Sequence, residues 1–213
     1  MAVKHRSEPE EGPSFGIHAS HYLARAETRL QEIAPQALFY AAFELRCGFE
    51  ARMSQYLAAQ AAVSKKKKKG YQIAKLAKNI EAVFKSGEKY VRLTVEDSAG
   101  VVAVELWYSP VTAALRKHAE WCGDLLHAQQ RYRKPNDRWW DMVRHRLREM
   151  SELLSLAMRG ELLGVPLMNP TGAVEFAIEY LEERALHEKL KVGGHHIFRV
   201  RYLTDPPQEW LDA

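Results

Sequence analysis

The longest regular pattern in the sequence spans residues 35–62 and repeats apolar side chains at helical spacing. A single stripe along this segment consists of Leu38, Ala42, Leu45, Phe49 and Tyr56. The segment should begin at its proline, because the first turn of a helix leaves amide hydrogens unpaired and proline has none to lose. A helix with such a stripe buries it against other helices. The pattern therefore predicts a helical bundle.

Five further segments show helical spacing or helix boundaries. Ser109 and Pro110 should cap and open one of them, and Asp137 should cap another that ends at Gly160. We expect these helices at residues 18–33, 71–84, 109–130, 138–159 and 171–190.

The period changes to two in residues 90–108, where apolar and polar residues alternate around a turn at residues 97–100. Residues 196–202 alternate in the same way. We place them against the hairpin, because a two-stranded ribbon alone is only marginally stable. The expected fold class is mainly α (α+β), a helical bundle with a small antiparallel β-sheet made of the hairpin at 90–108 and a C-terminal strand at 196–202.

A chain of 213 residues suits one domain. We expect that domain to span residues 16–213, with the hairpin at 90–108 as an insertion and a disordered tail at residues 1–15. Five consecutive lysines at residues 65–69 repel one another. They predict an exposed lysine-rich linker at residues 64–70; a nucleic-acid-binding tail is the alternative.

The composition narrows the class of protein. The N-terminus lacks the pattern of a signal peptide, and no apolar run reaches the roughly 20 residues that span a bilayer, so we expect a cytoplasmic chain that makes no membrane contact. The two cysteines, Cys47 and Cys122, are too few for a disulfide scaffold or a zinc site. Adjacent His195 and His196 would point to opposite faces of a strand, which argues against a shared metal ion. We expect no metal and no cofactor.

The net charge of +4 permits a polyanionic partner. The basic residues are concentrated in residues 131–148, where seven arginines and lysines face only Asp137 and Asp141, with Tyr132 and two tryptophans interleaved. Cations neutralise phosphates and aromatic rings stack on unpaired bases. Alternatively, the segment is a solvated helix face whose tryptophans are buried in the core or in a dimer interface. The candidate nucleic-acid-binding residues are Arg131, Arg133, Lys134, Arg138, Trp139 and Arg144.

Two arrangements of arginine and histidine are candidates for catalysis. Arg138 and His145 lie seven positions apart, so on a helix they project from nearly one face, about two turns apart. A neutral imidazole can take the proton of a 2′-hydroxyl, and a guanidinium can stabilise the charge that develops on the phosphate. In the second arrangement, Arg46 and Glu50 share a face of the long helix, and His127 ends the helix that should pack on it. We expect His127 to lie beside Arg46 where the two helices meet, in a structural or site-framing role.

Two short motifs on the predicted helices resemble the HEPN superfamily of bacterial helical bundles. The first consists of Glu44, Leu45, Arg46 and Glu50, and the second of Leu125, Leu126 and His127. That resemblance implies a toxin–antitoxin or antiviral defence protein. Active members of the superfamily are metal-independent ribonucleases with four to six residues between an arginine and the histidine that follows it, a spacing that Arg138 and His145 meet with six. His127 departs from this pattern, because the nearest preceding arginine is Arg116.

The sequence therefore predicts a HEPN-like protein that acts on or binds RNA, as a metal-independent endoribonuclease if it is an enzyme. The alternative is a non-catalytic module of a defence complex that binds a protein or a nucleic acid. In either case we expect a homodimer or a partner protein. An enzyme acting on a small metabolite is a third possibility, which no phosphate loop or acid–base pair supports.

Overall fold

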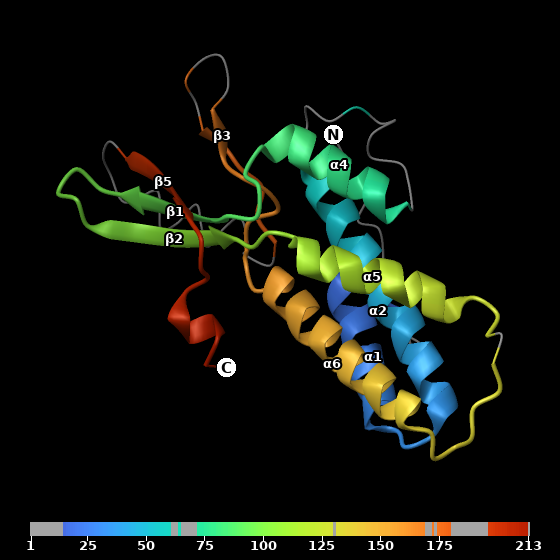
Figure 1. Cartoon of the computed structure of the whole chain (residues 1–213). Helices are drawn as coiled ribbons and strands as arrows, with labels where there is room; N and C mark the ends of the chain where they lie inside the picture. Colours follow the sequence, from blue (N-terminus) through green and yellow to red (C-terminus); the bar gives the residue numbers. More distant parts are fainter. Residues whose placement is uncertain are drawn as a thin grey trace, which may run out of the picture.

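The computed structural model describes residues 15–60, 64, 72–129, 131–168, 172, 174–179 and 196–212. In these residues, α-helices form a bundle and a three-stranded antiparallel sheet projects from one end of it (Figure 1). The predicted fold class is confirmed. The predicted tail at residues 1–15 and linker at residues 64–70 lie outside the described residues, apart from Phe15 and Ser64.

The long helix predicted from the apolar stripe is the centre of the bundle. It packs against the other four helices of the described chain, and its stripe from Leu38 to Tyr56 is buried. Because this burial removes apolar surface of the central helix and of its neighbours from water, it stabilises the whole bundle. The helices are α1 (Ala19–Gln31), α2 (Pro35–Ala59), α4 (Ile73–Phe84), α5 (Ala113–Leu126) and α6 (Arg138–Met158).

The helix caps agree with the sequence at one helix and differ at another. The Asp137 side chain accepts a hydrogen bond from the backbone N–H of Trp139 at 2.9 Å, as its position before α6 predicted. The predicted cap of α5 is wrong: Thr112 Oγ1 accepts from the N–H of Leu115 at 3.2 Å. Ser109 is buried, and its hydroxyl donates to the carbonyl of Leu156 at the end of α6. The last carbonyls of α6 have no intrahelical donor, and the Ser109 hydroxyl pairs with one of them instead of capping α5.

The hairpin and the C-terminal strand form the predicted sheet. Its strands are β1 (Tyr90–Glu96), β2 (Val102–Tyr108) and β5 (Ile197–Leu203), in the order β2-β1-β5 with antiparallel pairing throughout. Val91, Leu93 and Val95 are fully buried on one face. The other face is polar, and its side chains are considered below.

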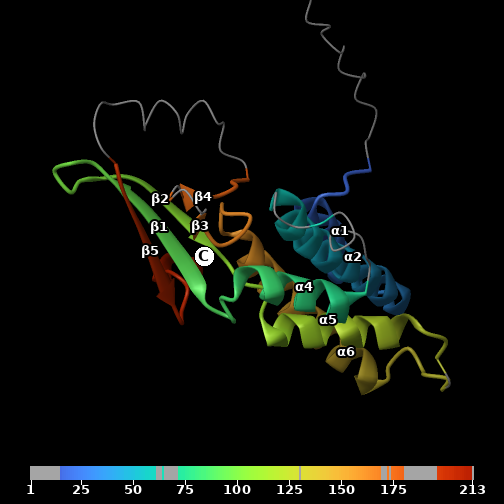
Figure 2. The same cartoon turned by 90° about the horizontal axis from the view of Figure 1, so that it is seen from above.

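The helix predicted at residues 171–190 is wrong where the structure describes it. Two short strands, β3 (Leu167–Met168) and β4 (Val174–Glu175), pair beside the sheet on its helix side (Figure 2), and Ile178 forms a bridge to Leu162. Phe176 and Ile178 pack against the core. Valine, phenylalanine and isoleucine at positions 174, 176 and 178 alternate with other residues, which is a strand pattern. Residues 180–190 lie outside the described chain.

Among the described helices, none combines the length and the apolar character that crossing a bilayer requires.

Candidate nucleic-acid interface and the polar clusters around it

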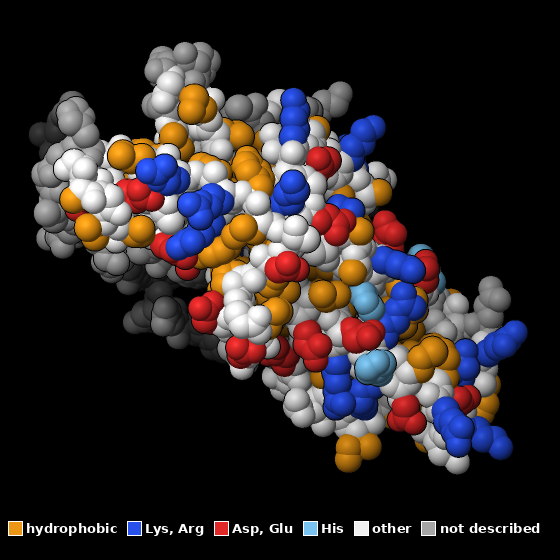
Figure 3. Space-filling view, turned by 60° about the vertical axis from the view of Figure 1, so that its left-hand side comes forward, with side chains coloured by type: hydrophobic (Ala, Val, Ile, Leu, Met, Phe, Trp, Pro, Cys, Tyr) orange, Lys and Arg blue, Asp and Glu red, His pale blue; other side chains and the backbone are white. Residues whose placement is uncertain are grey.

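The connection between α5 and α6 forms the end of the molecule farthest from the sheet (Figure 1). Arg131, Lys134 and Arg138 are exposed there, and their side chains make no ion pair or hydrogen bond with any described residue. Tyr132 among them is 89% exposed. Basic side chains gather at this end of the surface (Figure 3). We call these four residues the basic tip.

The tryptophans next to the basic tip hold the connection against the bundle. The Arg133 guanidinium lies 4.0 Å from the ring centre of Trp139 and 3.9 Å from a carboxylate oxygen of Asp137. Trp140 stands edge-on to Phe39, at 6.0 Å between ring centres, and its indole N–H donates to the Lys134 carbonyl. Both tryptophans are half-buried and pack on the core. Arg133 and Trp139 were predicted from the sequence to bind nucleic acid. In the structure they contact each other instead and stabilise the conformation of the basic tip.

Arg144 also has a structural task. Its two terminal nitrogens donate to the carbonyls of Leu30 and Ile33, at 2.7 and 3.3 Å, and so fix the turn between α1 and α2. A cleft of about 320 Å³ opens between that turn and the α5–α6 connection. Its lining includes Ile33, Pro135, Trp140, Asp141 and Arg148. This apolar and charged cleft adjoins the basic tip through Pro135.

The structure does not join Arg138 and His145 into a site. Arg138 opens α6 and points its free cation to solvent. The His145 side chain is 76% exposed two turns later, and its Nε2 lies 3.4 Å from Glu149. That glutamate lines a cavity of about 600 Å³, together with Glu27 and Glu152. These three carboxylates outnumber Arg159, the one arginine of the lining, and the resulting negative charge disfavours phosphate chemistry at His145.

His118 lines the same cavity on the side of α5. Burial lowers the pKa of this histidine, and the nearby Arg146 guanidinium lowers it further. Its Nδ1 atom is buried without a hydrogen-bond partner. The sequence did not single out His118, because a histidine on an amphipathic helix carries no signal of its own.

Arg46 lies where α2 meets α5, as predicted. Its Nε donates to Glu50 at 3.1 Å, and a Cβ atom built on Gly123 would collide with its guanidinium, so the arginine occupies the space that this glycine leaves. Burial raises the pKa of Glu50, and Arg46 opposes that rise. His127 comes one turn after Gly123 and ends α5 with an exposed side chain that has no partner among the described residues. The structure therefore does not hold His127 against Arg46.

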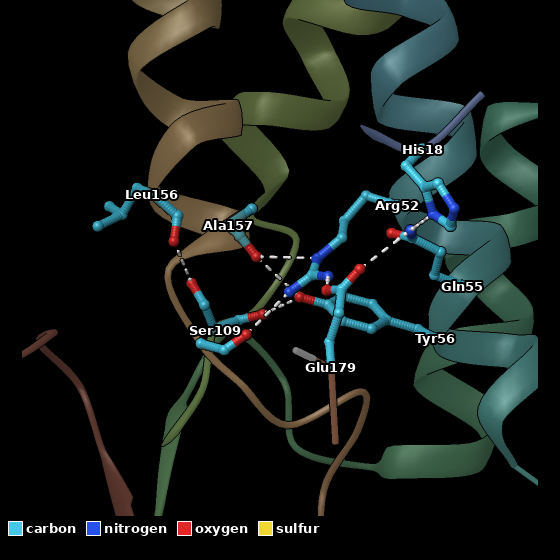
Figure 4. Close-up of polar contacts among 9 residues, drawn as sticks. His18, Arg52, Gln55, Tyr56, Ser109, Leu156, Ala157 and Glu179 are labelled. Carbon is cyan, nitrogen blue, oxygen red and sulfur yellow. Dashed lines mark hydrogen bonds and ion pairs between the residues drawn. The ribbon is translucent and has the colours of Figure 1, made fainter. Parts of the chain in front are cut away.

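A buried cluster of polar side chains was not among the candidates predicted from the sequence (Figure 4). Arg52 of α2 is 1% exposed and donates from Nε to the Ala157 carbonyl and from Nη2 to the Gly160 carbonyl, both at 3.1 Å. Its Nη1 pairs with Glu179. A helix end leaves carbonyls unpaired, and a cation there satisfies them and the helix dipole. We call the cluster of Arg52, Tyr56 and Glu179 the arginine clasp.

Neighbouring side chains complete the arginine clasp. The Tyr56 ring lies 4.6 Å from the guanidinium, and its hydroxyl is 2.6 Å from the Ser109 carbonyl and 2.9 Å from that of Ala157. Burial raises the pKa of Tyr56 above its usual value, so the phenol keeps its donor. Gln55 donates to the second carboxylate oxygen of Glu179. Since all three guanidinium nitrogens of Arg52 are engaged, the clasp is structural. Its sequence signal was a charged residue at a buried position, three residues after Phe49 and four before Tyr56.

The described residues contain no group of three or more histidine, cysteine, aspartate or glutamate side chains that could hold a metal ion. Comparison of the chain with protein-family models, curated proteins and solved structures finds no match.

Proposed function

We propose that this chain is a non-catalytic module that binds single-stranded RNA through its basic tip. The observation that carries the proposal is the unpaired state of Arg131, Lys134 and Arg138 around a tyrosine that is 89% exposed. Most other arginines of the described chain have carboxylate, carbonyl or aromatic partners. Cations without internal partners are free to replace the counterions of a phosphate backbone.

Two further observations support a single strand as the form of the nucleic acid. An exposed tyrosine ring offers a stacking surface to an unpaired base, which a duplex does not present. The cleft beside the basic tip, with Trp140 and Ile33 in its wall, offers apolar surface to a second base. The acidic lining of the 600 Å³ cavity makes the middle of α6 unfavourable for the same ligand. Binding without cleavage is favoured, because His145 adjoins that acidic surface and His127 has no partner arginine.

The test is the salt dependence of binding to a fluorescein-labelled single-stranded RNA, measured by anisotropy between about 50 and about 200 mM salt. Replacing Arg131, Lys134 and Arg138 together by glutamine should reduce the magnitude of the slope of log K against log salt. Each lost phosphate contact removes roughly 0.7 from this slope, so the three changes together should remove about 2. Tyr132→Ala should weaken binding by about 1–3 kcal/mol and leave the slope unchanged, since stacking releases few ions.

The matched control replaces three exposed lysines on α4 and α5, Lys75, Lys78 and Lys117, by glutamine. It removes the same charge from another surface, so its slope should stay near that of the wild type. If the triple change at the basic tip binds like the wild type at every salt concentration, the tip is not the interface. RNA cleavage that resists chelators and disappears in His145→Ala would instead restore the ribonuclease hypothesis.

A further inference from the structure

The polar face of the sheet places two arginines directly opposite each other. Arg92 of β1 pairs in register with Arg201 of β5 on one side and with Trp107 of β2 on the other. Directly opposed side chains on neighbouring antiparallel strands approach closely, so like charges there are destabilising. This arrangement is unfavourable unless something neutralises it.

The carboxylates of this face are already committed to other partners. Glu105 pairs with Arg92. Glu96 accepts from Arg199 Nε through both oxygens, at 3.0 and 2.9 Å. Arg201 is exposed, and its side chain has no partner among the described residues. Three guanidinium groups against two carboxylates leave one positive charge in excess. Acidic and basic side chains intermingle over this solvent-facing side of the sheet (Figure 3).

The same two arginines line a small cavity of about 160 Å³, together with Thr94, Glu96 and Val102. The Nε–H of Arg92 is buried and has no acceptor, although the other end of this guanidinium binds Glu105. A buried donor without an acceptor costs free energy comparable to a lost hydrogen bond. Two of the lining residues are therefore incompletely paired: Arg92 has a buried donor without an acceptor, and Arg201 has a charge without a partner among the described residues. The Thr94 hydroxyl, 3.5 Å from Glu96, makes only a weak bond.

The geometry points to an oxyanion site at this cavity that takes a phosphate group between Arg92 and Arg201. A phosphate oxygen would supply the missing acceptor of Arg92, and its charge would offset the opposed cations. Guanidinium groups present donors in a planar fork that suits phosphate oxygens. Glu96 stays neutralised by Arg199, so it does not cancel the excess charge. The site lies at the end of the molecule opposite the basic tip and does not depend on the RNA-binding proposal (Figure 1).

The phosphate group has two possible sources, a small phosphomonoester and the phosphodiester backbone of a nucleic acid. The full chain is titrated with inorganic phosphate, with a nucleoside 5′-monophosphate and with a short oligoribonucleotide that has no terminal phosphate. Arginine Nε–H resonances report the site directly, because the Nε–H of Arg92 gains an acceptor on binding. All titrations hold the ionic strength constant with chloride, since phosphate salts also strengthen folding in a general way.

We expect saturable shifts of the Nε–H signals of Arg92 and Arg201 in the wild type. Arg201→Gln should raise the dissociation constant at least about tenfold, which corresponds to 1.4 kcal/mol. In chloride alone, the same variant should melt at a higher temperature than the wild type, because the opposed charge is gone. Lys117→Gln is the charge-matched control and should change neither quantity.

A response to inorganic phosphate and to the nucleoside 5′-monophosphate, but not to the oligoribonucleotide, identifies a small phosphorylated ligand. A response to the oligoribonucleotide alone identifies backbone recognition. Either result supports the site. Equal responses of wild type and Arg201→Gln to every probe, or a lower melting temperature of Arg201→Gln in chloride, would overturn it.

Discussion

Replacing Arg52 by methionine should destabilise the protein more than any change at its surface. Methionine keeps most of the buried volume but removes the donors to Ala157, Gly160 and Glu179. The two carbonyls and the carboxylate then lose those donors at a largely buried helix end. Breaking one partner out of a buried ion pair costs about 3–5 kcal/mol, because the other charge stays behind uncompensated. We expect the free energy of unfolding to fall by that amount.

Urea denaturation followed by tryptophan fluorescence measures this loss. In Arg52→Met/Glu179→Gln the stranded charge is also gone, so the double variant should lose less than the sum of the single ones, with a coupling of at least about 1 kcal/mol. Arg116→Met breaks the exposed pair with Glu88 and should cost under about 1 kcal/mol. A loss below about 1 kcal/mol for Arg52→Met, or strict additivity in the cycle, would refute the reasoning.

Three other outcomes follow from side chains described above. His127→Ala should change the free energy of unfolding by no more than about 0.5 kcal/mol in the same denaturation assay, since the imidazole is exposed and unpartnered; a larger loss would show that it is held after all. Burial lowers the pKa of His118 below 6.5, so the unfolded chain takes up this proton first as the pH falls. Stability should therefore decline below about pH 6.5, and urea midpoints at about pH 7.5 and about pH 5.5 should differ less in His118→Gln than in the wild type. Gly160→Ala should lower the melting temperature and cost about 1–3 kcal/mol or more, because the new Cβ would lie 2.6 Å from the Trp107 carbonyl oxygen and 2.8 Å from the Ser109 nitrogen, and backbone cannot move aside; unchanged melting would contradict this packing.

Local periodicity was enough to predict most of the fold. The stripe of α2 and the alternation of the hairpin each repeat several times, and the strand at residues 196–202 was placed correctly because a ribbon needs a third partner. The segment at residues 174–179 was mistaken for a helix, since three alternating apolar residues are too short a pattern to decide. The cap of α5 failed for another reason: Ser109 is used by a helix end that lies far away in the sequence.

Among the polar sites, contacts within one helix were also predictable, whereas contacts between residues far apart in the sequence were not. The pair of Arg46 and Glu50 was predictable because both residues lie on one helix, four positions apart. The partners of Arg52 are separated from it by 105 to 127 positions, and no spacing rule reaches them. Arg144 illustrates the converse, because a basic residue in a basic segment suggested a ligand contact, whereas the tertiary structure uses it to hold the turn between α1 and α2.

The arginine clasp also has a consequence for the order in which the protein is made. During synthesis α2 leaves the ribosome complete long before Ala157, Gly160 and Glu179 have been added. Until they arrive, the arginine in the apolar stripe of the nascent helix lacks the carbonyls and the carboxylate that bind its N–H groups, and its charge favours water over a closed core. The N-terminal helices therefore gain little by assembling early. The bundle should close around α2 only after most of the chain has emerged, which makes folding a late and cooperative step of translation.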